Sequence, residues 1–266
     1  MFAIEVTNLT KKFKEVIAVN DISFTVPQGS VFAFLGPNGA GKSTTIKMMT
    51  TLLQPTIGSV RLNGHDLASS PNEVRKNFGI VFQDQSLDDE LTAYENMDFH
   101  GAVYHMPSDT RKKKIEHLLK FVELWERKND LVKHFSGGMK RRLEIARGLL
   151  HHPKILFLDE PTIGLDPQTR NHIWSYIQKM NKEEKITIFF TTHYMEEAEK
   201  IADQIAIIDN GKIIAQGSSN ELKKQTKCNT LEEAFIQLTG REIRAEEAAL
   251  SDHMRMNRKM WRRRGK

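Results

Sequence analysis

A run of five apolar residues followed at once by a glycine-rich segment restricts the fold more than any other feature of this 266-residue sequence. Residues 31–35 (VFAFL) fit a strand that is buried on both faces. Residues 36–44 (GPNGAGKST) match the pattern G-x-x-x-x-G-K-S, in which backbone N–H groups at the start of a helix surround an anion. We therefore expect a loop that binds nucleotide phosphates, in preference to a glycine-rich turn without a ligand.

Two residues of this loop have predicted chemical roles. Lys42 would reach the β- and γ-phosphates, and Ser43 would bind Mg²⁺. The other residues expected to contact the nucleotide here are Gly36, Pro37, Asn38, Gly39, Ala40, Gly41 and Thr44.

Two further apolar runs, residues 155–158 and 186–190, also end in residues suited to phosphate chemistry. Ligands bind at the carboxyl ends of the strands in an open parallel sheet. Asp159 would hold Mg²⁺, Glu160 would act as a general base toward water, and His193 would donate to the γ-phosphate. Taken alone, the two acids could simply begin a loop and the histidine could be structural. Three strand ends with such residues favour one shared site.

The alternation of apolar strands with helical stretches indicates an α/β fold with a largely parallel sheet. Residues 1–30 predict short strands, and 58–64 predict a strand that leads into an Asn-Gly turn. The pattern over 88–150 is mainly helical, with one helix beginning near 107–109. A second Asn-Gly pair predicts a hairpin over 205–215.

The composition, 39% hydrophobic and 27% charged, is typical of a globular protein. No apolar run approaches the roughly 20 residues that span a bilayer. The N-terminus also lacks the pattern of a secretory signal, so we expect a cytosolic chain that is not itself a pore. A single cysteine, Cys228, excludes an internal disulfide and a cysteine-clustered metal site.

The positive net charge of +5 comes from the C-terminal segment. Residues 241–266 carry nine basic and four acidic side chains, so residues 1–240 are formally neutral. This basic C-terminal extension could contact an anionic surface such as lipid, or it could be a solvated terminus without a partner.

Further motifs occur in the order found in one protein family. They are Phe13 in LTKKF, Gln83 in GIVFQ, residues 135–139 (FSGGM), Asp166 in GLDP and His193 in TTHYMEEA. With the phosphate loop and Asp159-Glu160, they make residues 2–240 resemble the ATP-binding subunit of an ABC transporter. Two departures, Met139 for the usual Gln and Phe135 for Leu, replace no charged group.

The resemblance implies a role for each matching residue. Phe13 would stack on adenine, Gln83 would contact Mg²⁺ and face a membrane partner, and Asp166 would lie at the nucleotide shared by two subunits. The nucleotide on a second copy of the chain would also be contacted by Ser136, Gly137 and Gly138. By itself this last segment would be only the capped start of an amphipathic helix.

The resemblance also implies an architecture and a function. The fold would be a P-loop NTPase (RecA-like) core with a small antiparallel β subdomain and an inserted helical subdomain at about 88–150, within one domain over 1–240. Two copies, or one copy and a homologous ATPase, would share ATP and Mg²⁺ head to tail. Hydrolysis would energise a separate permease at the cytoplasmic face of the membrane. The motifs are most similar to daunorubicin-type exporters, which implies export of a drug-like, lipid or glycan substrate.

Two other functions are less favoured. An ABC-type ATPase acting on the ribosome or on nucleic acid has only the basic extension in its support. The chain has one ATP unit, and residues 36 and 136 are too close for an inserted coiled coil. A small-molecule kinase would have no role for the FSGGM segment or for His193.

Overall fold

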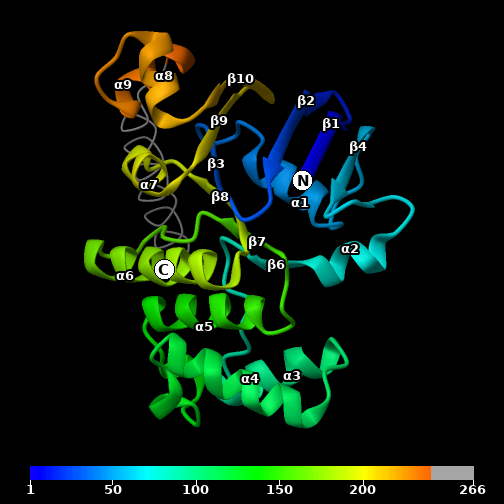
Figure 1. Cartoon of the computed structure of the whole chain (residues 1–266), viewed down its shortest axis with the longest axis vertical. Helices are drawn as coiled ribbons and strands as arrows, with labels where there is room; N and C mark the ends of the chain where they lie inside the picture. Colours follow the sequence, from blue (N-terminus) through cyan, green and yellow to red (C-terminus); the bar gives the residue numbers. More distant parts are fainter. Residues whose placement is uncertain (241–266) are drawn as a thin grey trace, which may run out of the picture.

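The computed structural model describes residues 1–240; the basic extension of residues 241–266 lies outside the described residues. Its centre is a six-stranded sheet in the order β10-β9-β3-β8-β7-β6, in which the strands from β9 to β6 are parallel and β10 is antiparallel (Figure 1). The strands are β3 (Val31–Leu35), β6 (Phe78–Val81), β7 (Ile155–Asp159), β8 (Thr187–Thr192), β9 (Gln204–Asp209) and β10 (Lys212–Gly217). The three apolar runs of the sequence are the adjacent strands β3, β8 and β7, as predicted.

The register of these strands brings their carboxyl ends level. Leu35 pairs with Thr192, and Asp159 pairs with Thr191. The residues that follow β3, β7 and β8 therefore lie at one edge of the sheet, as the sequence predicts.

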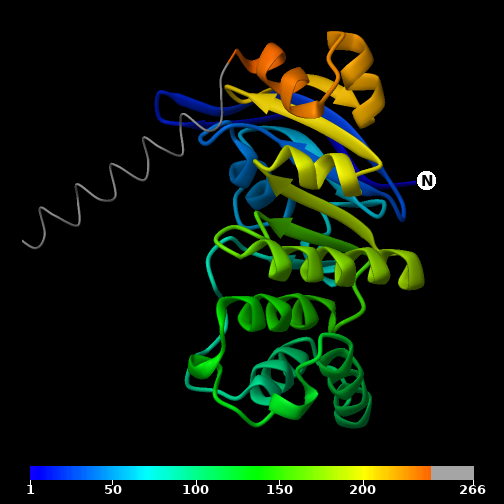
Figure 2. The ribbon, with the colours of Figure 1, turned by 90° about the vertical axis from the view of Figure 1, so that its left-hand side faces the viewer.

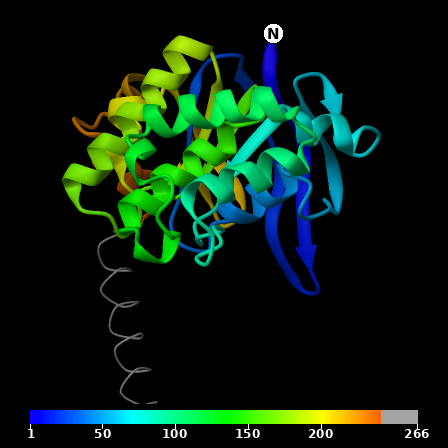
Figure 3. The same cartoon turned by 90° about the horizontal axis from the view of Figure 1, so that it is seen from below.

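A second, antiparallel sheet has the order β2-β1-β4-β5. Its strands are β1 (Phe2–Phe13), β2 (Val16–Pro27), β4 (Ile57–Leu62) and β5 (His65–Asp66). Figure 3 shows β1 and β2 as a long ribbon along one side of the molecule. The prediction of short strands over residues 1–30 is wrong, since β1 and β2 each have 12 residues.

The reason for this error is a pair of irregular positions inside the hairpin. Asn8 and Asp21, which suggest turns in the sequence, both adopt positive φ, and the Asn8 amide donates to the Asp21 carboxylate at 2.9 Å. Register shifts on both sides of Leu9 absorb the extra residues, so the ribbon continues through them.

Both faces of the central sheet are covered, which explains its continuous apolar runs. On one face Phe32 and Phe34 pack with the antiparallel sheet and with Ile46 of α1 (Lys42–Met49). On the other face Val31 and Ala33 pack with the helices. These include α6 (Pro167–Glu184) and α7 (Met195–Ile201), and the chain continues into α8 (Ser219–Thr226) and α9 (Leu231–Thr239).

The segment predicted to be helical forms a layer beyond α6, at one end of the molecule (Figure 2). It contains α3 (Ala93–Val103), α4 (Ser108–Phe121), α5 (Gly137–Leu149) and the 3-10 turns Trp125–Arg127 and Val132–His134. One further helix, α2 (Pro71–Asn77), precedes β6. Within residues 1–240 no helix has both the length and the apolar character needed to cross a membrane.

Candidate nucleotide-binding site

The loop predicted to bind phosphate connects β3 to α1 at the carboxyl edge of the central sheet. Gly41 is the N-cap of α1 with φ 108°, and a β-carbon there would lie 2.5 Å from the Ala18 carbonyl oxygen, so only glycine fits. No side chain caps the helix at this residue. The backbone N–H groups at the start of α1 are therefore suited to an anionic ligand.

Lys42 is buried at the centre of this loop, with 5% of its surface exposed. Its ammonium donates to the carbonyl oxygens of Gly36 (2.7 Å) and Pro37 (3.2 Å). It also lies 3.4 Å from Glu160 Oε1. The loop thus curls around its own lysine and holds the positive charge beside the end of β7.

Glu160 joins the loop to the end of β8. Its backbone N–H donates to both the carbonyl oxygen (3.2 Å) and Oγ1 (3.0 Å) of Thr191, and its Oε2 lies 2.8 Å from His193 Nδ1. Burial opposes ionisation of this carboxyl, but the hydrogen bond with His193 and the charge of Lys42 outweigh burial, so the pKa of Glu160 lies below its usual value. At neutral pH the group is a carboxylate and can accept a proton.

Asp159, the last residue of β7, is also buried, and its Oδ1 accepts a 2.6 Å hydrogen bond from Thr191 Oγ1. The Thr191 hydroxyl therefore orients both acids: it donates to the Asp159 carboxylate and accepts from the Glu160 N–H. Sequence reasoning assigned no role to Thr191. Its place at the end of β8, next to β7 in a parallel sheet, is the signal that could have identified it.

The other predicted residues lie at exposed positions around this centre. Phe13 ends β1, is 44% exposed and has the Lys11 ammonium 5.1 Å from its ring centroid. Gln83 follows β6, and its carbonyl accepts from the Arg141 guanidinium at 3.2 Å. Asp166 is the N-cap of α6 and accepts from the N–H of Thr169 at 3.0 Å. All three residues are exposed, so their side chains are available to ligands or to another chain.

The FSGGM segment begins α5 as predicted. Ser136 is the N-cap, and its hydroxyl accepts from the Met139 N–H at 3.3 Å. One turn later, Arg141 donates to the Phe82 carbonyl oxygen (2.6 Å) and pairs with the buried Glu144 (3.0 Å). The start of α5 is thereby attached to the segment that carries Gln83, a link that the sequence pattern does not reveal.

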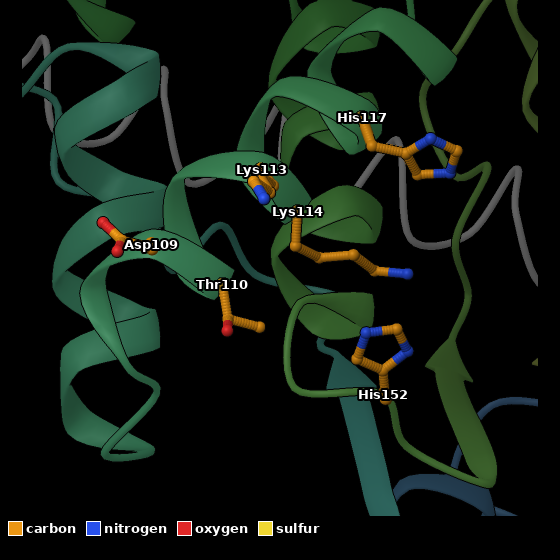
Figure 4. A pocket seen from close by; sticks show the side chains of 6 residues that line it. All are labelled: Asp109, Thr110, Lys113, Lys114, His117 and His152. Atoms are coloured by element: carbon orange, nitrogen blue, oxygen red, sulfur yellow. The ribbon is translucent and has the colours of Figure 1, made fainter.

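A separate cavity of about 380 Å³ lies at the surface of the helical layer (Figure 4). Its lining comes from α4 and from the turn after α5, and consists of Asp109, Thr110, Lys113, Lys114, His117 and His152. None of the predicted site residues lines this cavity, so it is distinct from the nucleotide-binding site.

Comparison with known proteins identifies similar chains. The family model "ABC transporter" matches residues 19–163. The daunorubicin/doxorubicin resistance ATP-binding protein DrrA of Streptomyces peucetius is 40% identical over 248 residues, which are 93% of this chain and 74% of that protein.

Solved structures agree with this likeness. One described as the ATP binding subunit of an ABC transporter superposes with a TM-score of 0.81 at 30% identity, covering 89% of this chain and 99% of that one. The ATP-binding cassette MJ0796, solved as a dimer in a post-hydrolysis state bound to ADP and Pi, gives a TM-score of 0.72 at 28% identity, covering 81% and 98%.

Proposed function

Because this chain belongs to the ABC transporter family of ATP-binding proteins, we propose that it hydrolyses ATP to energise a separate membrane permease. The contacts among Lys42, Glu160 and His193 at one sheet edge carry this proposal. The likeness to a daunorubicin/doxorubicin resistance protein favours export of a drug-like, lipid or glycan substrate.

Lys42 and Glu160 have complementary roles in hydrolysis. The triphosphate recruits the Lys42 ammonium, which neutralises charge on the β- and γ-phosphates and leaves the Glu160 carboxylate without its cation. Glu160 then accepts a proton from the attacking water as the water oxygen bonds to the γ-phosphorus and the bond to ADP breaks. His193, next to Glu160, donates to the γ-phosphate and orients the carboxylate.

The residues proposed for Mg²⁺ form an oxygen-donor set, which suits a hard cation: the Ser43 hydroxyl, the Asp159 carboxylate and the Gln83 amide oxygen. Within residues 1–240 no group of three or more His, Cys, Asp or Glu could hold a metal ion alone. This is the arrangement expected where nucleotide oxygens supply other ligands. Bound Mg²⁺ would neutralise charge that develops on the phosphates.

We further propose that ATP joins two copies head to tail. Ser136, Gly137 and Asp166 are exposed at two helix N-termini, where backbone N–H groups favour an anion from another subunit. The dimeric state of the similar MJ0796 cassette supports this assembly. Phe13, at the hairpin end, would stack on adenine. The complex would lie at the cytoplasmic face of the membrane, where the permease is bound.

Phosphate release from Mg·ATP tests the reaction. We expect hydrolysis without any added phosphate acceptor, and little or none with Lys42→Ala. Glu160→Gln should retain ATP and elute as a dimer in Mg·ATP, because it keeps the phosphate contacts and removes the base. Glu196→Gln, the same change at an exposed position of α7, is the matched control. A rate that requires an acceptor would instead indicate a kinase.

A pull-down in mild detergent from the native cells, followed by mass spectrometry, tests the partner. A stoichiometric polytopic membrane protein supports the transport proposal. Ribosomal or nucleic-acid partners without a permease would contradict it.

A further inference from the structure

One buried carboxylate next to the site has no part in the hydrolysis described above. Glu197 of α7 is 5% exposed. Its Oε1 accepts from Thr162 Oγ1 at 2.5 Å, and its Oε2 accepts from Thr192 Oγ1 at 2.8 Å. Both threonines are themselves buried. A buried carboxylate with a separate partner on each oxygen is held in one orientation, and it holds both partners in turn.

The partners of Glu197 belong to segments that carry site residues. Thr162 lies two residues after Glu160, and Thr192 lies immediately before His193. Arg170, in the first turn of α6, is the third partner, with its Nε 3.5 Å from Glu197 Oε1. The Arg170 guanidinium also lies 4.0 Å from the ring centroid of Tyr194, on the far side of His193 in sequence.

Glu197 therefore contacts both ends of the segment 162–170, which contains Asp166, as well as the turn of His193. The buried Nε of Arg170 makes no hydrogen bond among the described residues, so a small movement toward Glu197 would turn their 3.5 Å contact into a hydrogen bond. A displacement of the His193 turn would be transmitted to the whole segment through one side chain.

The segment 162–170 in turn lies against the start of α5. A β-carbon at Gly138 would lie 2.5 Å from Thr169 Cγ2, and one at Gly137 would lie 3.7 Å from Leu165 Cδ2. Thr169 also donates from its hydroxyl to Asp166 at 2.6 Å. The loop cannot move toward α5 without a clash, so its position and that of the FSGGM segment depend on each other.

We propose that Glu197 is a positioning residue that couples the γ-phosphate contact of His193 to the dimer-forming residues Asp166 and Gly138. The inference rests on the proposed ATPase function and adds to it a coupling between the turn of His193 and the segment 162–170. When His193 engages the γ-phosphate, Thr192 and Thr162 move together through Glu197, and the 162–170 segment takes the position that a second copy binds.

Two isosteric substitutions, each removing one arm of this link, test the proposal. Thr162→Val and Thr192→Val delete one hydroxyl each and preserve shape; Thr192→Val also removes the acceptor of the Tyr194 N–H (3.0 Å). We expect each to lower kcat about tenfold while KM for ATP changes less than about twofold. The double variant should be no slower than Thr192→Val alone, because that substitution already separates the Glu197 carboxylate from the residue before His193, whereas Thr162→Val leaves the Arg170 contact in place. Mg·ATP dimerisation of the Glu160→Gln variant should weaken in the same non-additive way.

Thr226→Val is the matched control, since it removes a buried hydroxyl of α8 that bonds only to backbone carbonyl oxygens of its own helix. It should change stability without changing kcat. Glu197→Ala is less suitable, because it removes the acceptor of two buried hydroxyls at once and could prevent folding. The threonine variants therefore carry the test.

The outcomes separate the two levels of the argument. If the reductions in kcat of the two single variants multiply in the double variant, the role of Glu197 is overturned and the ATPase proposal stays intact. The same holds if neither single variant lowers kcat more than Thr226→Val does. A wild-type chain that does not hydrolyse ATP would overturn both.

Discussion

Thr191 offers a measurement of how strongly the Asp159 carboxylate and the backbone of Glu160 are held in place. Its buried hydroxyl donates to Asp159 and accepts from the Glu160 N–H. Thr191→Val keeps the shape and β-branching that suit β8 and removes both hydrogen bonds. The two losses are unequal. Glu160 N–H retains the Thr191 carbonyl oxygen at 3.2 Å, whereas Asp159 loses a 2.6 Å bond to its charged oxygen inside the protein.

The expected cost follows from this inequality. A hydrogen bond to a charged group contributes about 1.5–3 kcal/mol, and the loss at Glu160 adds little. We therefore expect Thr191→Val to lower the free energy of unfolding by about 2–3 kcal/mol, mostly through Asp159. The control Thr226→Val removes a bond to neutral carbonyl oxygens and should cost about 1 kcal/mol.

Urea unfolding of the two variants and the wild type measures the difference, provided that the slopes agree. A cost for Thr191→Val no larger than that of the control would refute the reasoning. It would mean that Asp159 finds another partner, or water, at no net cost. ATP hydrolysis by the same variant should also fall, because both carboxylates lose their orientation.

Three further predictions concern other features. The pKa of Glu160 lies below its usual value, so its contribution to the free energy of unfolding is fully present above the unfolded-state pKa. That contribution is lost as the pH falls through the lower folded-state pKa. Urea unfolding from about pH 7 to pH 3 should show a weaker pH dependence in Glu160→Gln than in the wild type. Gly138→Ala should cost about 1–3 kcal/mol because of the 2.5 Å approach to Thr169, whereas Gly137→Ala, with 3.7 Å of space, should not destabilise the chain. Deletion of residues 255–266, seven of which are basic, should reduce binding to vesicles of anionic lipid; unchanged binding would remove the lipid proposal for the extension.

The sequence was sufficient for the strands of the core and for the edge where the site lies. Residues 31–35, 155–158 and 186–190 are apolar throughout because both faces of the sheet are covered, and such runs leave few alternatives. Their polar successors must then meet, since parallel strands end together. Lys42, Glu160 and His193 do meet, as that argument requires.

Features that depend on pairing between distant residues were not predictable in this way. Asn8 and Asp21 look like turn residues until each is seen to bond the other across a bulge. Glu196 and Glu197 are adjacent identical acids, yet one is exposed and the other is buried with three partners. Nothing in a single sequence distinguishes them, because burial is decided by how α7 packs and not by local propensity.

The contacts of Lys42 have a consequence for what the site rejects. The ammonium is satisfied by two loop carbonyl oxygens and is balanced by Glu160. A monovalent anion that enters must compete with these three partners for the Lys42 ammonium, and it can accept hydrogen bonds from only a few of the loop N–H groups. A triphosphate offers several charged oxygens at once and reaches the helix start as well. The internal carboxylate thus competes with an incoming anion for the Lys42 ammonium, and we expect a ligand with several charged oxygens to displace it more readily than a monovalent anion.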